Sequence, residues 1–183
     1  AVFNHQSKIT VWDCCAASGG KSILAKDVLA DIDLTVSDIR ESIVANLKKR
    51  FQQAGIKNYK SVVADLTGNQ KLVTGNYDLI IADVPCSGSG TWSRTPEQLS
   101  FFKKEEIERY SLLQRKIIGN TIPHLAPGGY FLYITCSVFK KENEENAEFI
   151  KNEFNLELVK MDSIKGYDRK ADTMFAALFK RSL

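Results

Sequence analysis

Apolar runs of strand length alternate with longer segments of helical periodicity along most of the chain. This alternation predicts β-strands joined by α-helices. The predicted strands are residues 8–15, 34–38, 60–65, 77–84, 130–135, 156–161 and 173–181, and the predicted helices are residues 21–30, 40–54, 105–125 and 141–154. Strands that alternate with helices predict a doubly wound α/β fold, in which a mostly parallel seven-stranded sheet carries helices on both faces.

The apolar pattern also indicates which segments are buried and where they end. Residues 77–84 (YDLIIADV) and 130–135 (YFLYIT) are continuous apolar runs, typical of central strands in a parallel sheet. The helix over residues 105–125 is expected to stop before Pro127-Gly128-Gly129, and Pro123 should kink or end its last turn.

The composition is that of an ordinary globular protein. Of the 183 residues, 44% are hydrophobic and 26% are charged, which excludes disordered, collagenous and coiled-coil classes. No repeat or linker divides the chain, so we expect one domain over residues 1–183. The net charge of +3 is compatible with a polyanionic partner but does not require one. Because no apolar run reaches the ~20 residues that span a bilayer, and no signal peptide is evident, we expect a cytoplasmic monomer without membrane contact.

Four cysteines and two histidines limit the disulfide and metal chemistry. In a chain without a secretory signal, the cysteines are expected to be free thiols. No C-x-x-C motif occurs and the histidines stand in unrelated contexts, so we expect no metal site and place the histidines at surface or capping positions. The residues concerned are Cys14, Cys15, Cys86 and Cys136, with His5 and His124.

Acidic residues lie at or near the carboxyl ends of four of the predicted strands, at the edge where doubly wound sheets bind ligands. They are Asp13, Asp38, Asp65 and Asp83. Asp38 ends the second strand about 20 residues beyond a glycine turn, where nucleoside-binding folds hold ribose hydroxyls. The alternative for each aspartate is that it caps the segment that follows it. Their recurrence in successive loops favours a shared ligand site.

The glycine turn after the first strand matches a phosphate loop only in part. Ala17-Ser18-Gly19-Gly20-Lys21-Ser22 has the G-K-[ST] ending, but the Walker pattern requires glycine at position 15, which is Cys15. The dinucleotide pattern G-x-G-x-x-G is also missing. A nucleotide-binding ATPase is therefore the weaker hypothesis, and we interpret the turn as one that lets a ligand approach the backbone.

Two cysteines follow predicted buried strands at their carboxyl ends. Cys86 lies in Asp83-Val84-Pro85-Cys86-Ser87-Gly88-Ser89-Gly90, and Cys136 lies in Thr135-Cys136-Ser137. A lone cysteine in such a place is typical of an inert buried thiol. Two thiols at the mouth of one cleft, one of them beside an aspartate and a flexible glycine-rich loop, instead indicate a nucleophile with a helper.

Several motifs combine into a specific pattern. They are Cys15-Ala16-Ala17-Ser18-Gly19-Gly20-Lys21, Asp83-Val84-Pro85-Cys86-Ser87-Gly88-Ser89-Gly90, Tyr133-Ile134-Thr135-Cys136-Ser137, Gln114, Pro127-Gly128-Gly129 and Asp172-Thr173-Met174-Phe175-x-Ala177. With them, nearly the whole chain resembles the Sun/Fmu-type RNA (cytosine-5)-methyltransferases, which use S-adenosylmethionine. The chain departs from that family at Ser18, where proline is usual and serine is expected to loosen the turn. The family's N-terminal RNA-binding region is expected to be absent from these residues.

The resemblance implies a Rossmann-like class I methyltransferase that modifies C5 of a cytosine in RNA, with ribosomal RNA ranked ahead of transfer RNA. By resemblance, Cys136 attacks C6 of the base and Cys86 assists release. Asp83 would hydrogen-bond the base edge, and Lys21 would support the developing charge. One alternative exchanges the cysteine roles, because DNA cytosine-5 methyltransferases take the nucleophile from the proline-cysteine loop. Another is an inactive scaffold of the same fold that binds the cofactor or RNA.

The resemblance also implies the cofactor site. S-adenosylmethionine is expected across the glycine turn, with Asp38 on the ribose hydroxyls and Asp65 near the adenine, although Asp65 is alternatively a simple turn residue. The implied cofactor-binding residues are Cys15, Ala16, Ala17, Ser18, Gly19, Gly20, Lys21, Asp38, Asp65 and Asp83.

A base inside an RNA stem does not reach a buried thiol, so the target cytosine is expected to be single-stranded or flipped out. The long loop after Cys86 carries side chains that would either stack on RNA at the entrance or pack the loop onto the domain: Trp92, Arg94, Phe101 and Phe102. Lys48-Lys49-Arg50 is expected on a solvated helix face. The acidic stretch over residues 142–148 argues against RNA on its helix.

Overall fold

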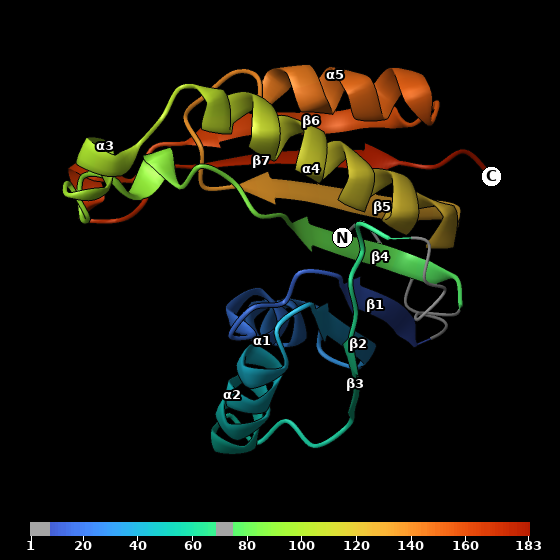
Figure 1. Ribbon diagram of the computed structural model, residues 1–183. Coiled ribbons are helices and arrows are strands. Elements are labelled where there is room, and N and C mark those ends of the chain that lie inside the picture. The colour runs from blue at the N-terminus through green and yellow to red at the C-terminus, as the bar shows by residue number, and fades with distance from the viewer. Residues whose placement is uncertain (1–7, 69–74) are drawn as a thin grey trace.

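The computed structural model describes residues 8–68 and 75–183 and places seven strands in one sheet (Figure 1). The strands are β1 (Ile9–Asp13), β2 (Ile32–Asp38), β3 (Tyr59–Val63), β4 (Tyr77–Asp83), β5 (Leu125–Thr135), β6 (Glu157–Ile164) and β7 (Met174–Lys180). Their order is β3-β2-β1-β4-β5-β7-β6. The first five strands in this order, from β3 through β2, β1 and β4 to β5, pair in parallel. Strand β7 is antiparallel to both of its neighbours. The predicted fold class is therefore confirmed.

In the part of the chain that the structure describes, five α-helices and three 3-10 turns connect the strands. They are α1 (Gly20–Leu29), α2 (Glu41–Gln53), α3 (Gln98–Phe101), α4 (Glu105–Thr121) and α5 (Glu144–Glu153), with η1 (Ser89–Thr91), η2 (Ile122–His124) and η3 (Tyr167–Arg169). The short α3 and the 3-10 turns had no counterpart in the apolar pattern. Helix α4 ends at Thr121, because Pro123 lies in the 3-10 turn that follows.

Several other boundaries also differ from the sequence prediction, and two of these differences have identifiable reasons. Strand β5 begins at Leu125 rather than at residue 130, because Leu125 pairs with Tyr77 before an irregularity at the Pro127-Gly128-Gly129 turn. Helix α5 begins at Glu144 rather than at residue 141. The residues just before Glu144 form turns, in which the backbone N–H of Glu142 donates to Phe139.

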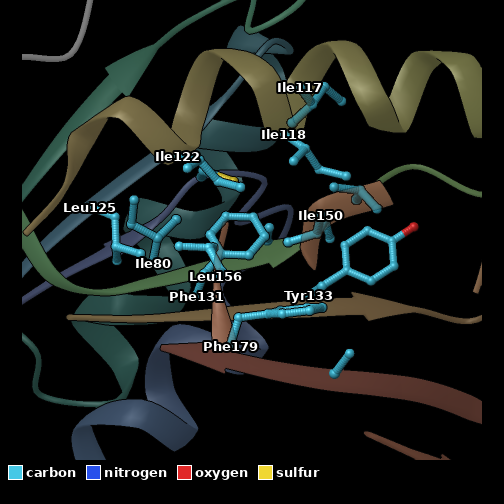
Figure 2. Close-up of a cluster of buried hydrophobic side chains, with 14 of the residues drawn as sticks. Ile80, Ile117, Ile118, Ile122, Leu125, Phe131, Tyr133, Ile150, Leu156 and Phe179 are labelled. Atoms are coloured by element: carbon cyan, nitrogen blue, oxygen red, sulfur yellow. The ribbon is translucent and has the colours of Figure 1, made fainter. Parts of the chain in front are cut away.

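Helices cover both faces of the sheet, as the pattern predicted. On one face, aromatic residues of β5 and β7 pack under α4 and α5, and Figure 2 shows Phe131, Tyr133 and Phe179 beneath Ile118 and Ile150. On the other face, α1 and α2 cover the half of the sheet made by β1 and β2. The apolar side chains there include Val11, Leu34, Val36, Leu47 and Phe51.

Helix α2 packs directly against the glycine turn. Gly19 has φ +81°, and a Cβ at this position would lie 2.5 Å from the Phe51 ring. Arg50 donates a 2.8 Å hydrogen bond to the hydroxyl of Ser18, while Lys48 and Lys49 are exposed as predicted. The turn that precedes α1 is thus held by α2, and Ser18 gains a partner that proline could not bind.

The strand ends define the position of the site. Asp83 of β4 pairs with Ile134 of β5, so the segments that carry Cys86 and Cys136 leave the sheet side by side. All four cysteines are free thiols in the structure, as predicted. Within the described ranges, no helix has both the length and the apolar character needed to cross a bilayer.

Candidate active site

A pocket of about 500 Å³ opens at the carboxyl ends of β1, β2, β4 and β5. It is lined by Cys14, Cys15, Ala17, Asp38, Ile39, Arg40, Ala64, Asp65, Leu66, Thr67, Asp83, Val84, Pro85, Cys86, Leu113, Ile117 and Cys136. The structure thus brings together most of the residues that the sequence singled out. The pocket lining does not include Ala16, Ser18, Gly19, Gly20 or Lys21.

The thiols of Cys86 and Cys136 face each other in this pocket, with their Sγ atoms 3.2 Å apart. The hydrogen bond from Cys86 lowers the pKa of Cys136, and the charge of Lys21 acts in the same direction. The same hydrogen bond, together with burial, raises the pKa of Cys86 well above its ordinary value. The two thiols share one hydrogen bond, so ionisation of one favours a proton on the other, and the nearby charge of Lys21 favours Cys136 as the thiolate.

An ion pair stands next to the thiols. Lys21, in the first turn of α1, lies with its Nζ atom 2.5 Å from Oδ2 of Asp83. Burial raises the pKa of Asp83 above its ordinary value, although the Lys21 charge opposes the shift. Asp83 is thus a carboxyl group that can hold a proton more readily than a solvated aspartate.

The residues of the partial phosphate loop are engaged with carboxylates. The hydroxyl of Ser22 donates to Asp13 at 2.6 Å, and Lys21 pairs with Asp83. A Walker loop needs both side chains for phosphate and magnesium, so this arrangement argues against the ATPase hypothesis. Asp13 is fully buried, its Oδ1 atom lacks a hydrogen-bond partner among the described residues, and burial raises its pKa to about 7.

Asp38 ends β2 and is already bound by protein donors. Its Oδ1 atom accepts the backbone N–H and Nε of Arg40, both at 3.0 Å. Its Oδ2 atom accepts Nη2 of Arg40 at 3.2 Å and the backbone N–H of Ala17 at 3.1 Å. Burial opposes ionisation, but the hydrogen bonds from Arg40 hold the pKa of Asp38 below its ordinary value. Asp38 is consequently an ionised acceptor in the pocket wall.

Asp65 closes a turn, which was one of the two interpretations considered for it, and it also lines the pocket. It accepts the backbone N–H of Thr67 at 2.8 Å and the Thr67 hydroxyl at 2.6 Å. The bond from the Thr67 hydroxyl is the main reason that the pKa of Asp65 lies below its ordinary value.

Comparison with known proteins identifies the family. The family described as 16S rRNA methyltransferase RsmB/F matches residues 1–179 of the chain. The chain belongs to the RsmB/F family. This membership confirms the resemblance that the combined motifs indicated.

The RsmB/F chain is similar to curated proteins and to solved structures. It is 32% identical over 143 residues to ribosomal RNA small subunit methyltransferase B of Salmonella paratyphi A, and the match covers 75% of this chain and 32% of the relative. It is 27% identical over 161 residues to ribosomal RNA small subunit methyltransferase F of Shewanella loihica, covering 87% of this chain and 33% of the relative. The chain thus spans about a third of the length of these curated relatives.

Two solved structures share the fold. PH0851 has a TM-score of 0.87 and 28% identity, and the match covers 94% of this chain and 42% of that protein. NSun6 from Pyrococcus horikoshii, solved with SFG, has a TM-score of 0.84 and 22% identity, with 96% and 48% of the two chains covered. The latter likeness is evidence for the fold alone.

One buried residue of this RsmB/F chain was missed by sequence reasoning. Glu142 belongs to the acidic stretch that was expected on a charged helix, but it precedes α5 and its side chain is 0% exposed. The sequence did carry a signal, because Glu142 and Asn146 stand at four-residue spacing in line with the apolar Ile150. The structure buries all three residues. Treating the stretch as one acidic surface was therefore wrong for Glu142.

The loop after Cys86 is fastened to the domain rather than left flexible. The Gly90 N–H donates to the carbonyl of Cys136 at 2.8 Å, and the Gly90 carbonyl accepts the Thr173 N–H at 3.0 Å. A Cβ at Gly90 would lie 2.0 Å from the Thr173 oxygen, so only glycine fits there. Arg94 adds a bidentate ion pair to Asp172, with contacts of 3.1 and 2.8 Å.

The aromatic residues of this loop differ in their surroundings. The Trp92 and Phe102 rings are 4.9 Å apart, and Phe102 stacks on Phe139 with 5.3 Å between centroids. These rings pack the loop onto the domain. Phe101 is 77% exposed and contributes to the outer surface instead. His124 hydrogen-bonds the Gly75 carbonyl and contacts Trp12, while His5 lies outside the described residues.

Proposed function

We propose that this chain is the catalytic domain of an RNA (cytosine-5)-methyltransferase that uses S-adenosylmethionine and acts on ribosomal RNA. The observation that carries the proposal is the pair of thiols 3.2 Å apart in the same pocket as Asp38 and Asp83. Family membership supports the reaction class, and the names of the curated relatives support ribosomal RNA of the small subunit as substrate.

The pocket fits the cofactor in size and charge. Its volume is within the range of about 300–1,000 Å³ typical of ligand sites. Three aspartates, Asp38, Asp65 and Asp83, line it together with one cation, Arg40. This excess of carboxyl groups suits the sulfonium and ammonium groups of S-adenosylmethionine and opposes a polyphosphate. When bound, the cofactor supplies an electrophilic methyl group. Membership of a methyltransferase family supports this choice.

In the proposed first step, the Cys136 thiolate adds to C6 of the cytosine and forms an S–C6 bond. The addition pushes electrons into the ring, because the C5–C6 double bond becomes an enamine that is nucleophilic at C5. Asp83, whose pKa is raised by burial, would donate a hydrogen bond or proton near N3. Lys21 at 2.5 Å from Asp83 supports the charge that remains on this carboxyl.

The second step restores the aromatic ring after C5 has gained its methyl group. The proton on C5 leaves to a base, the S–C6 bond breaks, and its electron pair returns to Cys136 as thiolate. Cys86 is placed to assist this release, because its Sγ atom is the near neighbour of the Cys136 sulfur. The charge of Lys21, which favours the thiolate of Cys136, supports these roles rather than the exchanged ones.

The surface beside the thiols supports access by RNA. Phe101 is exposed on α3, and Arg94 is 66% exposed in the loop after Cys86. Figure 1 shows this loop next to the β6–β7 connection, where Lys165, Arg169 and Lys170 are exposed. Exposed basic side chains contact phosphates, and an exposed ring stacks on an unpaired base.

Replacing Asp38 with alanine is expected to weaken S-adenosylmethionine binding by about 1–3 kcal/mol, since the variant loses the carboxylate that would accept the ribose hydroxyls and that holds Ala17 and Arg40 in the pocket wall. Calorimetry on the purified chain measures this change. Asp33→Ala, at an exposed position of the same strand, is the control and should bind as the wild type. An unchanged affinity in folded Asp38→Ala would contradict the ribose assignment.

The proposed function is tested by bisulfite sequencing of ribosomal RNA from cells with and without the gene. We expect one or a few cytosines to lose protection from conversion when the gene is deleted. An identical protection profile, together with retained binding of S-adenosylmethionine, would instead support the inactive scaffold.

A further inference from the structure

We propose that Glu142 is a positioning residue that holds the loops of Cys86 and Cys136 at their reactive separation; this inference rests on the proposed function. One carboxylate contacts the residue that follows each cysteine. Its Oε2 atom accepts the backbone N–H of Ser87 at 2.9 Å, and its Oε1 atom accepts the hydroxyl of Ser137 at 2.7 Å. Glu142 therefore links two loops that emerge from different strands.

The buried carboxyl group of Glu142 depends on these contacts for its hydrogen bonds. The side chain is 0% exposed, and the described residues provide no ion-pair partner for it. A third donor, Nε2 of Gln114, lies 3.0 Å from Oε2 and also binds the Pro85 carbonyl at 3.0 Å. A buried carboxylate is tolerated when such donors satisfy it and is strongly unfavourable when they leave. Displacing either cysteine loop would therefore remove a donor from the buried charge.

Serine hydroxyls fill the space between the two loops and strengthen the link. The Ser137 Oγ atom lies 3.2 Å from Oγ of Ser87 and 3.3 Å from Oγ of Ser89. The Ser89 Oγ atom also accepts the backbone N–H of Val138 at 2.9 Å. These bonds give the loops one defined relative position rather than a range of positions.

The separation matters because Cys86 and Cys136 act on the same base. A displacement of about 1 Å in a catalytic group can lower a rate by about 10²-fold. Glu142 does not line the cofactor pocket. Its loss is therefore expected to affect the thiol chemistry while cofactor affinity is retained.

The test uses Glu142→Gln, in which the amide keeps one acceptor but places an NH₂ group among donors. Two readouts are compared with the wild type. The first is closure of the Cys86–Cys136 disulfide by diamide, which accepts the two thiol hydrogens as the S–S bond forms and needs neither RNA nor methyl donor. The second is kcat and KM for S-adenosylmethionine. We expect disulfide closure to slow by at least about tenfold and kcat to fall by about 10²-fold, with KM unchanged.

Two variants complete the experiment. Glu145→Gln, three residues further on and exposed, is the matched control and should close the disulfide at the wild-type rate. Ser137→Ala removes one donor while it keeps the charge, and it replaces Glu142→Gln if that variant does not fold; slower closure is again expected. Closure at the wild-type rate in the folded variant would overturn the positioning role, as would a wild type that forms no disulfide. Slower closure in a chain that never methylates RNA would leave the positioning role intact and reject only the proposed function.

Discussion

Replacing Cys136 with alanine is expected to lower methyl transfer by more than about 10³-fold and to leave no covalent protein–RNA species. The physical reason is that cytosine C5 becomes nucleophilic only after a sulfur adds at C6, and Cys136 carries the thiol whose pKa is lowered. The measurement incubates the variant with its RNA and S-adenosylmethionine, and follows methylated product and, on a denaturing gel, a slowly migrating adduct.

The control for this experiment is Glu145→Gln, because Glu145 is exposed on α5 and does not line the pocket. It should retain methyl transfer. Product formation by Cys136→Ala at the rate of this control would show that Cys136 is not the nucleophile.

Replacing Cys86 with alanine is expected to give the opposite phenotype, which is accumulation of the covalent protein–RNA adduct. Cys136 still attacks, but the thiol 3.2 Å from it is missing when release is required. The adduct band should persist through denaturation, and turnover should fall by about 10²–10⁴-fold, the usual contribution of a proton-transfer group.

The two cysteine variants together discriminate between the alternatives. An adduct with Cys136→Ala and none with Cys86→Ala would exchange the roles, as in the DNA-type reaction. Full methylation by both variants would remove the thiols from the mechanism and support the scaffold interpretation.

The convergence of the site could be predicted from the sequence, because each site residue is recognised locally at a strand end and the topology brings these ends together. Asp38, Asp83, Cys86 and Cys136 each end or follow a strand, and parallel strands of a doubly wound sheet present these ends at one edge. Periodicity was sufficient to find the strands, so the pocket could be assembled without knowledge of any distance.

The contacts that organise the site could not be predicted in the same way. Glu142 and Arg40 act through hydrogen bonds to segments that the fold brings together, and their residue types alone favour a solvated surface. The 3.2 Å approach of the two thiols likewise depends on Gly90, which lets the loop reach the Cys136 carbonyl. Such properties belong to tertiary packing, which local pattern does not encode.

The place of β7 in the sheet imposes an order on the pairing of strands while the chain is being synthesised. β6 leaves the ribosome before β7, but β7 is its neighbour in the sheet and lies between it and β5. At about 5–20 residues per second, the apolar edge of β5 therefore stays open until residues 174–180 have emerged. A nascent chain paused in the β6–β7 connection would present that edge to chaperones and to unpaired strands of other chains, which favours aggregation.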